Sequence, residues 1–401
     1  MTTRPIARNR RVRCLVGVLA VAATVTAVAC VPRPPGEPTD APPEVHITYY
    51  PWYGTPEVDG SYSHWSHPVL DGFNVPTDAA ALAPDDIGAN YWPAAGLYSS
   101  NGPATVDRQM GEIAGAGIDV VVVSWWGPGS GEDRAVPLIL DAAAAHDLSV
   151  TFLIEPSFAT VSEARSWIVY LIDTYGEHPA FHRSAHHGGR PLFYTFAPMK
   201  FSAPTLSFGI PPDAWARVLT PGGSQTIRGT RYDAAIVAHV EQTLFVHLAA
   251  WAGFDAVNNY FASGSVTLPG TSIGLPVTGD TETWPDLLAR ADAHGLDFIP
   301  SVGPGYVDLR IRPGNVAATR DRRNGAYYAD MVAAACRTRP DIISITSYNE
   351  WHEGTQIEPT AAHVTPVTSY PGLERGPNQY LDQTREWAAA FTAGTLCDTG
   401  S

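Results

Sequence analysis

Two glutamates near the C-terminal end of the chain have the residue type and spacing that acid–base catalysis requires. Glu350 and Glu353 lie within SYNEWHEGTQIEP (347–359), a segment that directly follows the apolar run 342–346. Cleavage of a glycosidic bond uses two carboxyl groups, one of which protonates the leaving oxygen while the other acts on the opposite side of the sugar. Glutamates are also frequent on solvated loops. Their position immediately after a buried run is what favours a catalytic pair.

Other catalytic chemistries find little support in the sequence. His352 and Glu353 begin like the HExxH motif of zinc proteases, but Gln356 stands where the second histidine must be,. There is no GxSxG elbow of a serine hydrolase,. The 13 histidines show no compact ligand spacing and there is no CxxC pair, so the sequence predicts no metal site,.

The composition narrows the class of ligand. The 401 residues carry a net charge of −15, with 16% charged residues, 11 Trp and 17 Tyr. The sequence argues against a nucleic-acid partner, because 25 basic residues against 40 acidic ones leave no excess positive charge to neutralise a polyanion,. Many aromatic side chains on a weakly charged background suit a neutral ligand rich in hydroxyl groups.

The elements that must position these residues are short apolar runs between residues 45 and 390. The runs are continuous rather than alternating with polar residues, which is typical of strands buried on both faces of a parallel sheet. Seven runs can be placed, at 46–50, 118–126, 150–157, 191–198, 253–262, 297–306 and 342–351. An eighth strand is expected within 225–240.

Helical patterns separate these runs. Apolar residues recur at three- and four-residue spacing in 104–117, 135–148, 163–176 and 284–296,. Gly117 and Gly295 are expected C-caps. Strand–helix alternation in one unit predicts a single (β/α)8 TIM-type barrel over 45–395 with extended catalytic loops. An open doubly wound sheet is disfavoured, because GPGSGE (127–132) breaks the GxGxxG phosphate loop at its last position,.

Barrel enzymes hold their catalytic groups at the carboxyl ends of the strands. Aromatic residues gather at these ends, where Trp and Tyr could stack on sugar rings. One such aromatic is more often part of the core, but many at one face favour a sugar cleft. The residues expected at this face are Tyr49, Tyr50, Trp52, His64, Trp65, Trp125, Trp126, Glu155, Tyr194, Tyr260, Tyr348 and Trp351.

The first 44 residues have the features of an export leader followed by a tether. Residues 1–29 combine five arginines with an uncharged apolar run, 15–29, that is too short to span a bilayer comfortably,. Cys30 follows small residues as in a bacterial lipobox, where the cysteine is acylated, although cleavage by the general signal peptidase is an open alternative. Residues 30–44 are rich in proline and predict a stiff tether,. We expect an extracellular lipoprotein on a bacterial cell surface that meets the membrane only through its lipid anchor.

Export also bears on the two cysteines that follow the leader. Cys336 and Cys397 form an even pair in an oxidising compartment, which suits a disulfide that ties down the C-terminal tail,. Two separate buried thiols are an equally open interpretation.

With these residues identified, the chain resembles glycoside hydrolase family 99, the endo-α-1,2-mannosidase and endo-α-mannanase family. The resemblance covers essentially all of 45–390 and is most specific in its last two segments. The matching segments are YYPWYG (49–54), HW (64–65), DDIGANYWPAAGLYSS (85–100), SWWGPG (124–129), IEP (154–156), SQTIRGTRYD (224–233), GFD and YFA within 253–262, SVGPGYVDLRIRPGN (301–315) and ITSYNEWHEGTQIE (345–358).

The resemblance implies a retaining, endo-acting enzyme on α-1,2-linked mannose that requires no metal or other cofactor, and we expect a monomer. By position, Glu353 would be the acid/base, and Glu350 would be the base that takes the proton from the substrate's own 2-hydroxyl. The implied route passes through a 1,2-anhydro sugar rather than a glycosyl ester on the enzyme. The matching positions that line the substrate cleft are Tyr50, Glu155, Tyr260 and Arg312.

Two departures from the family pattern bear on the substrate, predicted as α-mannan or a mannose-rich oligosaccharide. Trp126 is predicted to wall the subsite beyond the cleaved mannose. It replaces the Tyr typical of animal Golgi members that trim glucosylated N-glycans, whereas bacterial, mannan-directed members tend to have SWW. Segment 263–280 is longer than usual and Asn258 replaces an aromatic, which leaves the outer subsites undefined. Two alternatives stay open, a non-catalytic glycan-binding lipoprotein and an enzyme that trims glucosylated high-mannose N-glycans.

Overall fold

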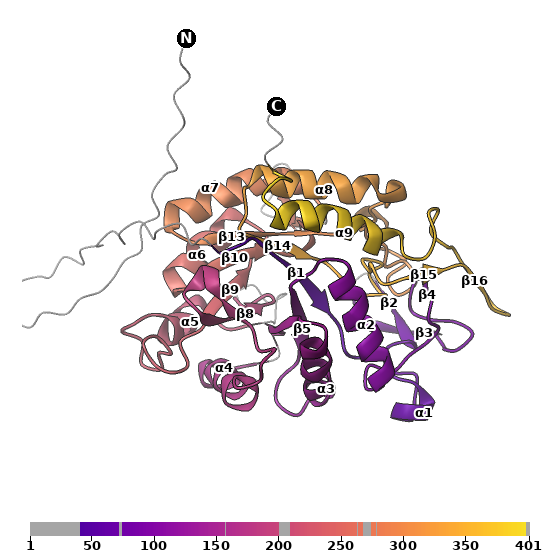
Figure 1. Ribbon diagram of the computed structural model, residues 1–401, viewed down its shortest axis with the longest axis horizontal. Coiled ribbons are helices and arrows are strands. Elements are labelled where there is room, and N and C mark those ends of the chain that lie inside the picture. Colours follow the sequence, from indigo (N-terminus) through magenta and orange to yellow (C-terminus); the bar gives the residue numbers. More distant parts are fainter. Residues whose placement is uncertain are drawn as a thin grey trace, which may run out of the picture.

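The computed structural model describes residues 41–71, 74–156, 158–199, 209–262, 264–267, 274–277 and 279–397 (Figure 1). Within these ranges eight parallel strands close into a barrel, because β1 pairs with both β5 and β14 and β6 pairs with β8. The strands follow one another around the barrel in chain order. They are β1 (Glu44–Tyr49), β5 (Val120–Trp125), β6 (Ser149–Ile154), β8 (Arg190–Thr195), β9 (Ala235–His239), β10 (Ala256–Asn259), β13 (Asp297–Val302) and β14 (Ile342–Ile345).

The TIM-type barrel predicted from the sequence is therefore confirmed. Each of the seven apolar runs overlaps one of these strands, and the eighth strand lies at 235–239, inside the expected range. Side chains alternate between two apolar environments. Val122 and Val237 belong to the barrel interior, whereas Val121 and Val123 pack beneath the surrounding helices. Burial on both faces is why the runs do not alternate with polar residues.

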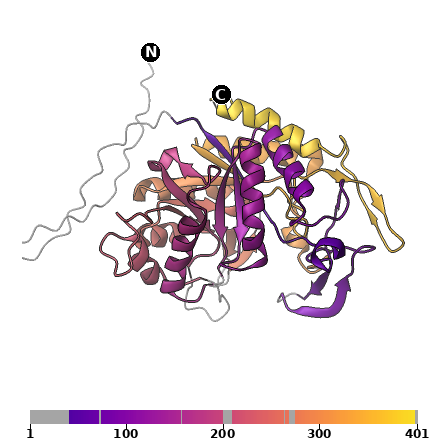
Figure 2. The same ribbon diagram turned by 60° about the horizontal axis from the view of Figure 1, so that its bottom comes forward.

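A helix follows each barrel strand and packs on the outside of the sheet (Figures 1 and 2). The helices are α2 (Pro103–Gly115), α3 (Gly131–Ala145), α4 (Val161–Tyr175), α5 (Pro212–Leu219), α6 (Thr243–Ala252), α7 (Trp284–His294), α8 (Ala326–Arg337) and α9 (Gln379–Thr392). Helices α2, α3, α4 and α7 correspond to the four predicted segments. Gly295 is the predicted C-cap of α7, with φ of 70°. Gly117 lies one residue beyond Ala116, the C-cap of α2.

Two long connections at the carboxyl ends of the strands carry the remaining small elements. The segment from β1 to α2 holds α1 (Pro56–Asp59), β2 (His67–Leu70), β3 (Pro76–Ala81) and β4 (Trp92–Pro93). The segment after β14 holds β15 (Thr360–Ala361), β16 (His363–Val364) and β17 (Ser369–Tyr370). Strand β15 pairs with β4, and an aromatic cluster that includes Trp65, Tyr98 and Trp351 fills the space between the two connections. Figure 2 shows the hairpins β2–β3 and β16–β17 projecting on the same side of the barrel.

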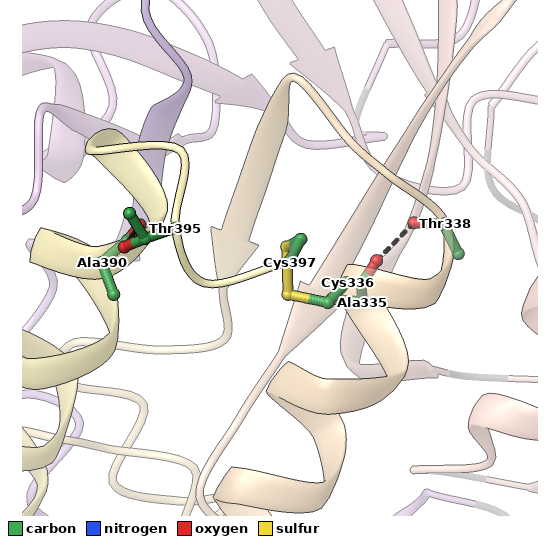
Figure 3. Close-up of a disulfide and its surroundings, with 6 residues drawn as sticks. All are labelled: Ala335, Cys336, Thr338, Ala390, Thr395 and Cys397. Carbon is green, nitrogen blue, oxygen red and sulfur yellow. Dashed lines mark hydrogen bonds between the residues drawn. A yellow bond between two sulfur atoms is a disulfide. The ribbon is translucent and has the colours of Figure 1, made fainter. Parts of the chain in front are cut away.

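Cys336 of α8 forms a disulfide with Cys397, which follows α9 (Figure 3). Of the two interpretations that the sequence left open, the disulfide is the one found. The bond connects residues 61 positions apart, and so holds the end of the C-terminal helix against its neighbour.

Several sequence predictions concern residues outside the described ranges. These are the leader 1–29, Cys30, residues 31–40 of the tether, and residues 263, 268–273 and 278 of segment 263–280. Within that segment β11 (Gly264–Thr267) and β12 (Gly274–Val277) form an antiparallel pair. In the part of the chain that is described, none of the helices combines the length and the apolar character needed to cross a bilayer.

Candidate active site

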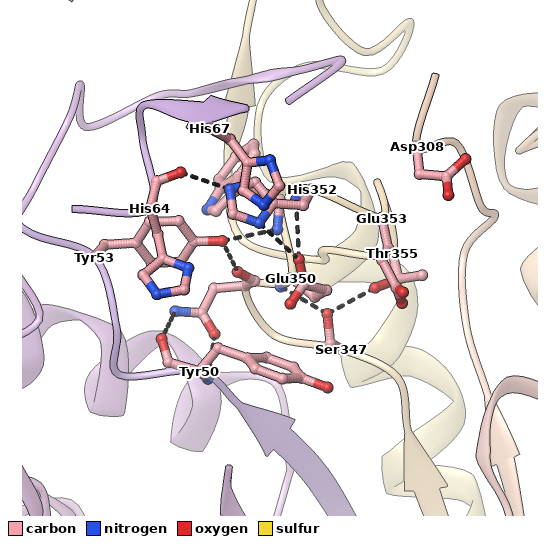
Figure 4. A network of polar contacts seen from close by, with 12 residues as sticks. Tyr50, Tyr53, His64, His67, Asp308, Ser347, Glu350, His352, Glu353 and Thr355 are labelled. Atoms are coloured by element: carbon pink, nitrogen blue, oxygen red, sulfur yellow. Dashed lines mark hydrogen bonds and ion pairs between the residues drawn. The ribbon is translucent and has the colours of Figure 1, made fainter. Parts of the chain in front are cut away.

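The predicted site residues lie at one end of the barrel because each follows the carboxyl end of a strand. Tyr50 follows β1, Trp126 follows β5, Glu155 follows β6, and Tyr260 follows β10. Glu350 and Glu353 lie on the loop that leaves β14. Figure 4 shows both carboxyl groups on this loop, with Glu353 on the side of Asp308 and Glu350 on the side of a histidine cluster.

Glu350 is a buried carboxyl group, 4% exposed, and its neighbours fix its position. Its backbone N–H donates to Ser347 Oγ at 2.8 Å, and its Oε1 accepts from the backbone N–H of His352 at 3.0 Å. Burial and the nearby charge of Glu353 together raise the pKa of Glu350 well above its ordinary value,. Glu350 is therefore a stronger base than an exposed carboxylate.

The ring of His352 adds no positive charge beside Glu350. Its Nε2 lies 2.6 Å from the carbonyl oxygen of His64, which can only accept, so Nε2 carries the ring proton,. Burial, with His67 and His64 nearby, lowers the pKa of His352 well below its ordinary value and keeps the ring neutral. The Nδ1 atom, 3.8 Å from Glu350 Oε1, then presents a lone pair rather than a charge.

Glu353 is more open, with 27% of its side chain exposed. The hydroxyl of Tyr306 donates to its Oε1 at 3.3 Å, and Arg312 Nη1 lies 3.9 Å from the same oxygen. Burial raises the pKa of Glu353, and the buried carboxylate of Asp308 raises it further, although Arg312 and Tyr306 act in the opposite direction. A carboxyl group that keeps its proton to higher pH, next to open space, suits a general acid.

A buried network positions the partners of Glu353. Asp308, fully buried, accepts at Oδ2 from the hydroxyl of Tyr306 (3.1 Å), from Asn315 Nδ2 (2.8 Å) and from Arg312 Nη1 (3.3 Å). Within the matching segment 301–315, the family resemblance assigns a role only to Arg312. The signal that could have found Tyr306 and Asp308 was their place directly after β13.

Tyr50 and Tyr260 join opposite sides of the site through a short contact between their hydroxyl groups. The backbone of Tyr50 is paired with the side chain of Asn349, which accepts from its N–H at 2.7 Å and donates to its carbonyl at 3.0 Å. Burial raises the pKa of both phenols, and the charges of Glu350, Glu353 and Glu155 raise it further. The three carboxyl groups are therefore close enough for their charges to act on both tyrosines.

Glu155 is the third carboxyl group at this end of the barrel. Its Oε1 accepts from Ser124 Oγ at 2.8 Å. Burial raises the pKa of Glu155 to about 8, with Glu132 and Glu353 adding to the effect and Ser124 opposing it. At neutral pH most molecules therefore hold a protonated Glu155, which can both donate to and accept from a sugar hydroxyl.

Neighbouring tryptophans at the end of β5 have different environments because successive strand residues point to opposite faces. Trp125 is fully buried, and its Nε1 donates to Asp133 Oδ1 at 2.8 Å beneath the helices. Trp126 is 40% exposed, beside the Trp125–Ile154 pair that leads to Glu155. The expectation that both would face the cleft is wrong for Trp125.

Other aromatic residues expected to line this face belong to the core. Tyr348 and Trp351 are fully buried, and donate to Glu112 and to Glu358 respectively, so they do not wall the glutamates. Trp65 packs in the aromatic cluster beneath the loops. Tyr194 lies in the barrel interior, where its hydroxyl contacts His46. Position at a strand end fixes where a residue lies along the barrel, but not which way it points.

The loop that carries both glutamates is held by contacts that local sequence does not reveal. Gly354 has φ of 59°, and a Cβ at this position would lie 2.6 Å from Val307 Cγ1,. The carbonyl of Glu353 accepts from the N–H of Val307 at 2.8 Å. Buried Arg322 donates to the carbonyls of Gly354 and Gln356, both at 2.9 Å. Glycine is thus required for the close approach that positions Glu353.

Residues 42–393 match the model of glycosyl hydrolase family 99. The chain belongs to this family. The match spans the whole barrel, from β1 before Tyr50 to α9 at the C-terminal end.

Individual members of family 99 align over most of their length. Glycoprotein endo-α-1,2-mannosidase of Xenopus laevis is 39% identical over 363 residues, covering 87% of this chain and 77% of the relative. The mouse protein of the same name is 39% identical over 87% of this chain and 75% of its own length. Among solved structures, the family 99 endo-α-mannosidase of Bacteroides thetaiotaomicron superposes with a TM-score of 0.77 at 36% identity, covering 87% of this chain and 98% of that one.

Proposed function

We propose that this family 99 hydrolase is an exported, retaining endo-α-1,2-mannosidase that cleaves internal α-1,2-mannosidic bonds of mannans or mannose-rich glycans. The observation that carries the proposal is the Glu350–Glu353 pair, two carboxyl groups of raised pKa on one rigid loop, facing Tyr50 and Tyr260. The names of the Xenopus and mouse relatives support cleavage of an α-1,2-mannosidic bond, and the name of the Bacteroides relative supports endo-acting cleavage of an α-mannoside.

In the proposed first step the substrate supplies its own nucleophile. Glu350 takes the proton from the 2-hydroxyl of the mannose whose bond is cleaved, and the 2-oxygen attacks C1 from the face opposite the leaving group. Glu353 gives its proton to the glycosidic oxygen as the C1–O bond breaks. The products are a 1,2-anhydro sugar, a released alcohol, a protonated Glu350 and an ionised Glu353.

The second step restores both glutamates. Glu353, now a carboxylate, takes a proton from water, and the water oxygen attacks C1 on the face that the leaving group left. The C1–O2 bond breaks, and Glu350 returns its proton to the 2-oxygen. Two inversions at C1 give overall retention. The stereochemistry of mannose suits this route, since its axial 2-oxygen lies anti to an axial leaving group, whereas the 2-hydroxyl of an α-glucoside is equatorial.

The remaining residues are proposed to bind sugar. Neutral Glu155, Tyr50 and Tyr260 offer hydroxyl donors and acceptors around the cleaved mannose, and Arg312 offers a cation beside Glu353. The exposed face of Trp126 is proposed to wall the next subsite. An indole accepts a mannose ring there without demanding a hydrogen bond.

Product analysis tests this proposal. The mature protein is incubated separately with α-mannan and with a glucosylated high-mannose glycan, and released oligosaccharides are identified by mass. We expect oligosaccharide products from α-mannan, and none from a Glu350→Gln control. Release from the glucosylated glycan alone would show an N-glycan-trimming enzyme, and binding of both glycans without release would show a glycan-binding protein.

Export and anchoring are a separate part of the proposal, because they rest on the leader and Cys30 alone. Acylation of Cys30 would hold the barrel at the cell surface through the proline-rich tether. Cys30→Ser should move the protein from the membrane pellet to the medium. Unchanged fractionation of the variant would remove the anchor while leaving the mannosidase proposal intact.

A further inference from the structure

The amino-terminal end of the barrel, opposite the catalytic loop, contains a cluster of three potential metal ligands. Glu44 and His46 lie at the start of β1, and His182 directly precedes β7 (Arg183–Ser184). His46 Nε2 lies 3.0 Å from Glu44 Oε2, and His182 Nε2 lies 3.7 Å from the same oxygen. All three ligand atoms lie within 4.8 Å of one another.

We propose that Glu44, His46 and His182 bind one zinc ion, or a similar borderline divalent cation, at the base of the barrel. Two imidazoles and one carboxylate form a ligand set that zinc accepts, leaving a fourth position for water. Ligands at about 2.1 Å from a tetrahedral ion lie about 3.4 Å apart. The separations found, 3.0 and 3.7 Å from Glu44 Oε2, lie on either side of this value.

The second observation that points to a ligand is the Nε2 atom of His182. The residue is 5% exposed, and within the described part of the chain this nitrogen has no hydrogen-bond partner. A buried polar atom left without a partner destabilises the fold, and a bound cation would satisfy it.

The surroundings of the cluster also suit a metal ion. The Nδ1 atom of His46 lies 2.9 Å from the hydroxyl of Tyr194. With Nε2 on the metal, Nδ1 would carry the proton and donate to that oxygen, an arrangement that orients most metal-binding histidines. Glu44 keeps 17% of its side chain exposed, which leaves an entry path from solvent.

The ion would stabilise the fold rather than take part in the proposed cleavage. It would join the first barrel strand to the segment between α4 and β8, which are distant in sequence. The catalytic glutamates lie at the opposite end of the strands, so the zinc site and the mannosidase proposal stand or fall separately. The cluster has no signature in the sequence, because His182 is far along the chain from its two partners.

Zinc binding by the full mature chain, without a histidine tag, tests this site. After treatment with a chelator, the protein is titrated with zinc chloride at pH 7.5, followed by calorimetry and by metal analysis after desalting. We expect one zinc per chain and a higher melting temperature with zinc than with magnesium, which prefers sites built from oxygen. Absence of zinc binding at 100 µM, about the weakest affinity worth calling a site, would overturn the proposal.

Matched variants locate the bound ion. His182→Gln should lose at least tenfold in zinc affinity and lose the thermal shift, while turnover of the glycan substrate stays the same. His186→Gln removes a neighbouring histidine and should bind zinc like the wild type. His46→Gln provides a second ligand variant should His182→Gln fold poorly. Undiminished zinc binding in both ligand variants would place the ion elsewhere, such as at the histidines around His352, and would overturn the proposal.

Discussion

The two halves of the loop that follows β14 each contain a buried glutamate, and the hydrogen-bond partners of these two glutamates differ. Glu358 is 1% exposed and accepts from Tyr98 (2.7 Å), Gln109 (2.9 Å), Trp351 (3.0 Å) and Arg108 (3.2 Å). Glu350, only eight residues earlier, accepts from the backbone N–H of His352 at 3.0 Å and lies close to the like charge of Glu353.

The difference separates a structural carboxylate from a reactive one. Burial raises the pKa of Glu358, but Arg108, Gln109 and Tyr98 all act against that rise. For Glu350 the charge of Glu353 adds to the effect of burial, and the raised pKa has weaker opposition. A carboxylate surrounded by donors is fixed in place as an acceptor, whereas one with few donors readily exchanges a proton.

Removing the acid should produce the largest loss of activity. Glu353→Gln keeps the shape of the side chain but cannot give a proton to the leaving oxygen. We expect kcat/KM for a natural glycan to fall by about 10²–10⁴-fold, with binding retained. An activated aryl or fluoride leaving group should recover much of the rate. Equal losses for good and poor leaving groups would contradict the assignment of Glu353 as the acid.

Removing the structural carboxylate should instead reduce stability. Glu358→Gln leaves Arg108 without its buried partner and places amide protons against existing donors, which should cost about 3 kcal/mol of unfolding free energy. Thermal and denaturant unfolding measure this loss. The folded fraction should keep near-normal kcat, and a loss of kcat matching that of Glu353→Gln would remove the distinction between the two halves.

In the same unfolding measurement, substitution of Glu350 should increase stability, whereas substitution of Glu358 should decrease it. Its pKa is raised in the folded state, so the native protein binds more protons than the unfolded chain between the two pKa values,. Stability is therefore lost as the pH rises through that interval. Glu350→Gln removes the buried charge and should raise the melting temperature at pH 7 while slowing every substrate. A lower melting temperature would show that Glu350 stabilises the fold.

Substitution of Trp126 is expected to have a smaller effect, a change in substrate preference. Trp126→Tyr should shift the ratio of kcat/KM values for mannose-capped and glucose-capped substrates toward glucose, by about 1 kcal/mol. Competition between the two substrates in one reaction measures the ratio directly. An unchanged ratio would show that Trp126 does not contact the sugar beyond the cleaved bond.

The smallest expected effect comes from removing one hydroxyl group, either the one that donates to Glu353 or the one that donates to Glu358. Tyr306 donates to Glu353 and lowers its pKa, so Tyr306→Phe should raise that pKa further. Glu353 then stays protonated to higher pH, so the alkaline limb of the profile of kcat/KM against pH should move to higher pH. Tyr98→Phe removes a donor to Glu358 and should leave the profile in place. A shift of the alkaline limb to lower pH in Tyr306→Phe would contradict the proposed effect of Tyr306 on the pKa of Glu353.

The barrel was predictable because its strands are continuous apolar runs. The position of Glu350 and Glu353 at the carboxyl end of the barrel was predictable because both follow the last of these runs. Helix α6 was missed, since its sequence TLFVHLAAWA is apolar on nearly every side and lacks a helical stripe,. The contacts of Arg322 with Gly354 and of Tyr306 with Glu353 join chain segments that only the fold brings together. The inward or outward direction of Tyr348 depends on the course of the loop after its strand.

The central claim is that Glu350 acts on the substrate's 2-oxygen instead of attacking the sugar itself. The most direct measurement is intact and peptide mass spectrometry of the wild-type enzyme saturated with a 2-deoxy-2-fluoro α-mannoside substrate, with binding checked by calorimetry. The account predicts a bound but uncleaved substrate and no added mass on residues 342–359, because fluorine cannot replace the attacking oxygen. A sugar ester on Glu350 would contradict it and would make that glutamate the nucleophile.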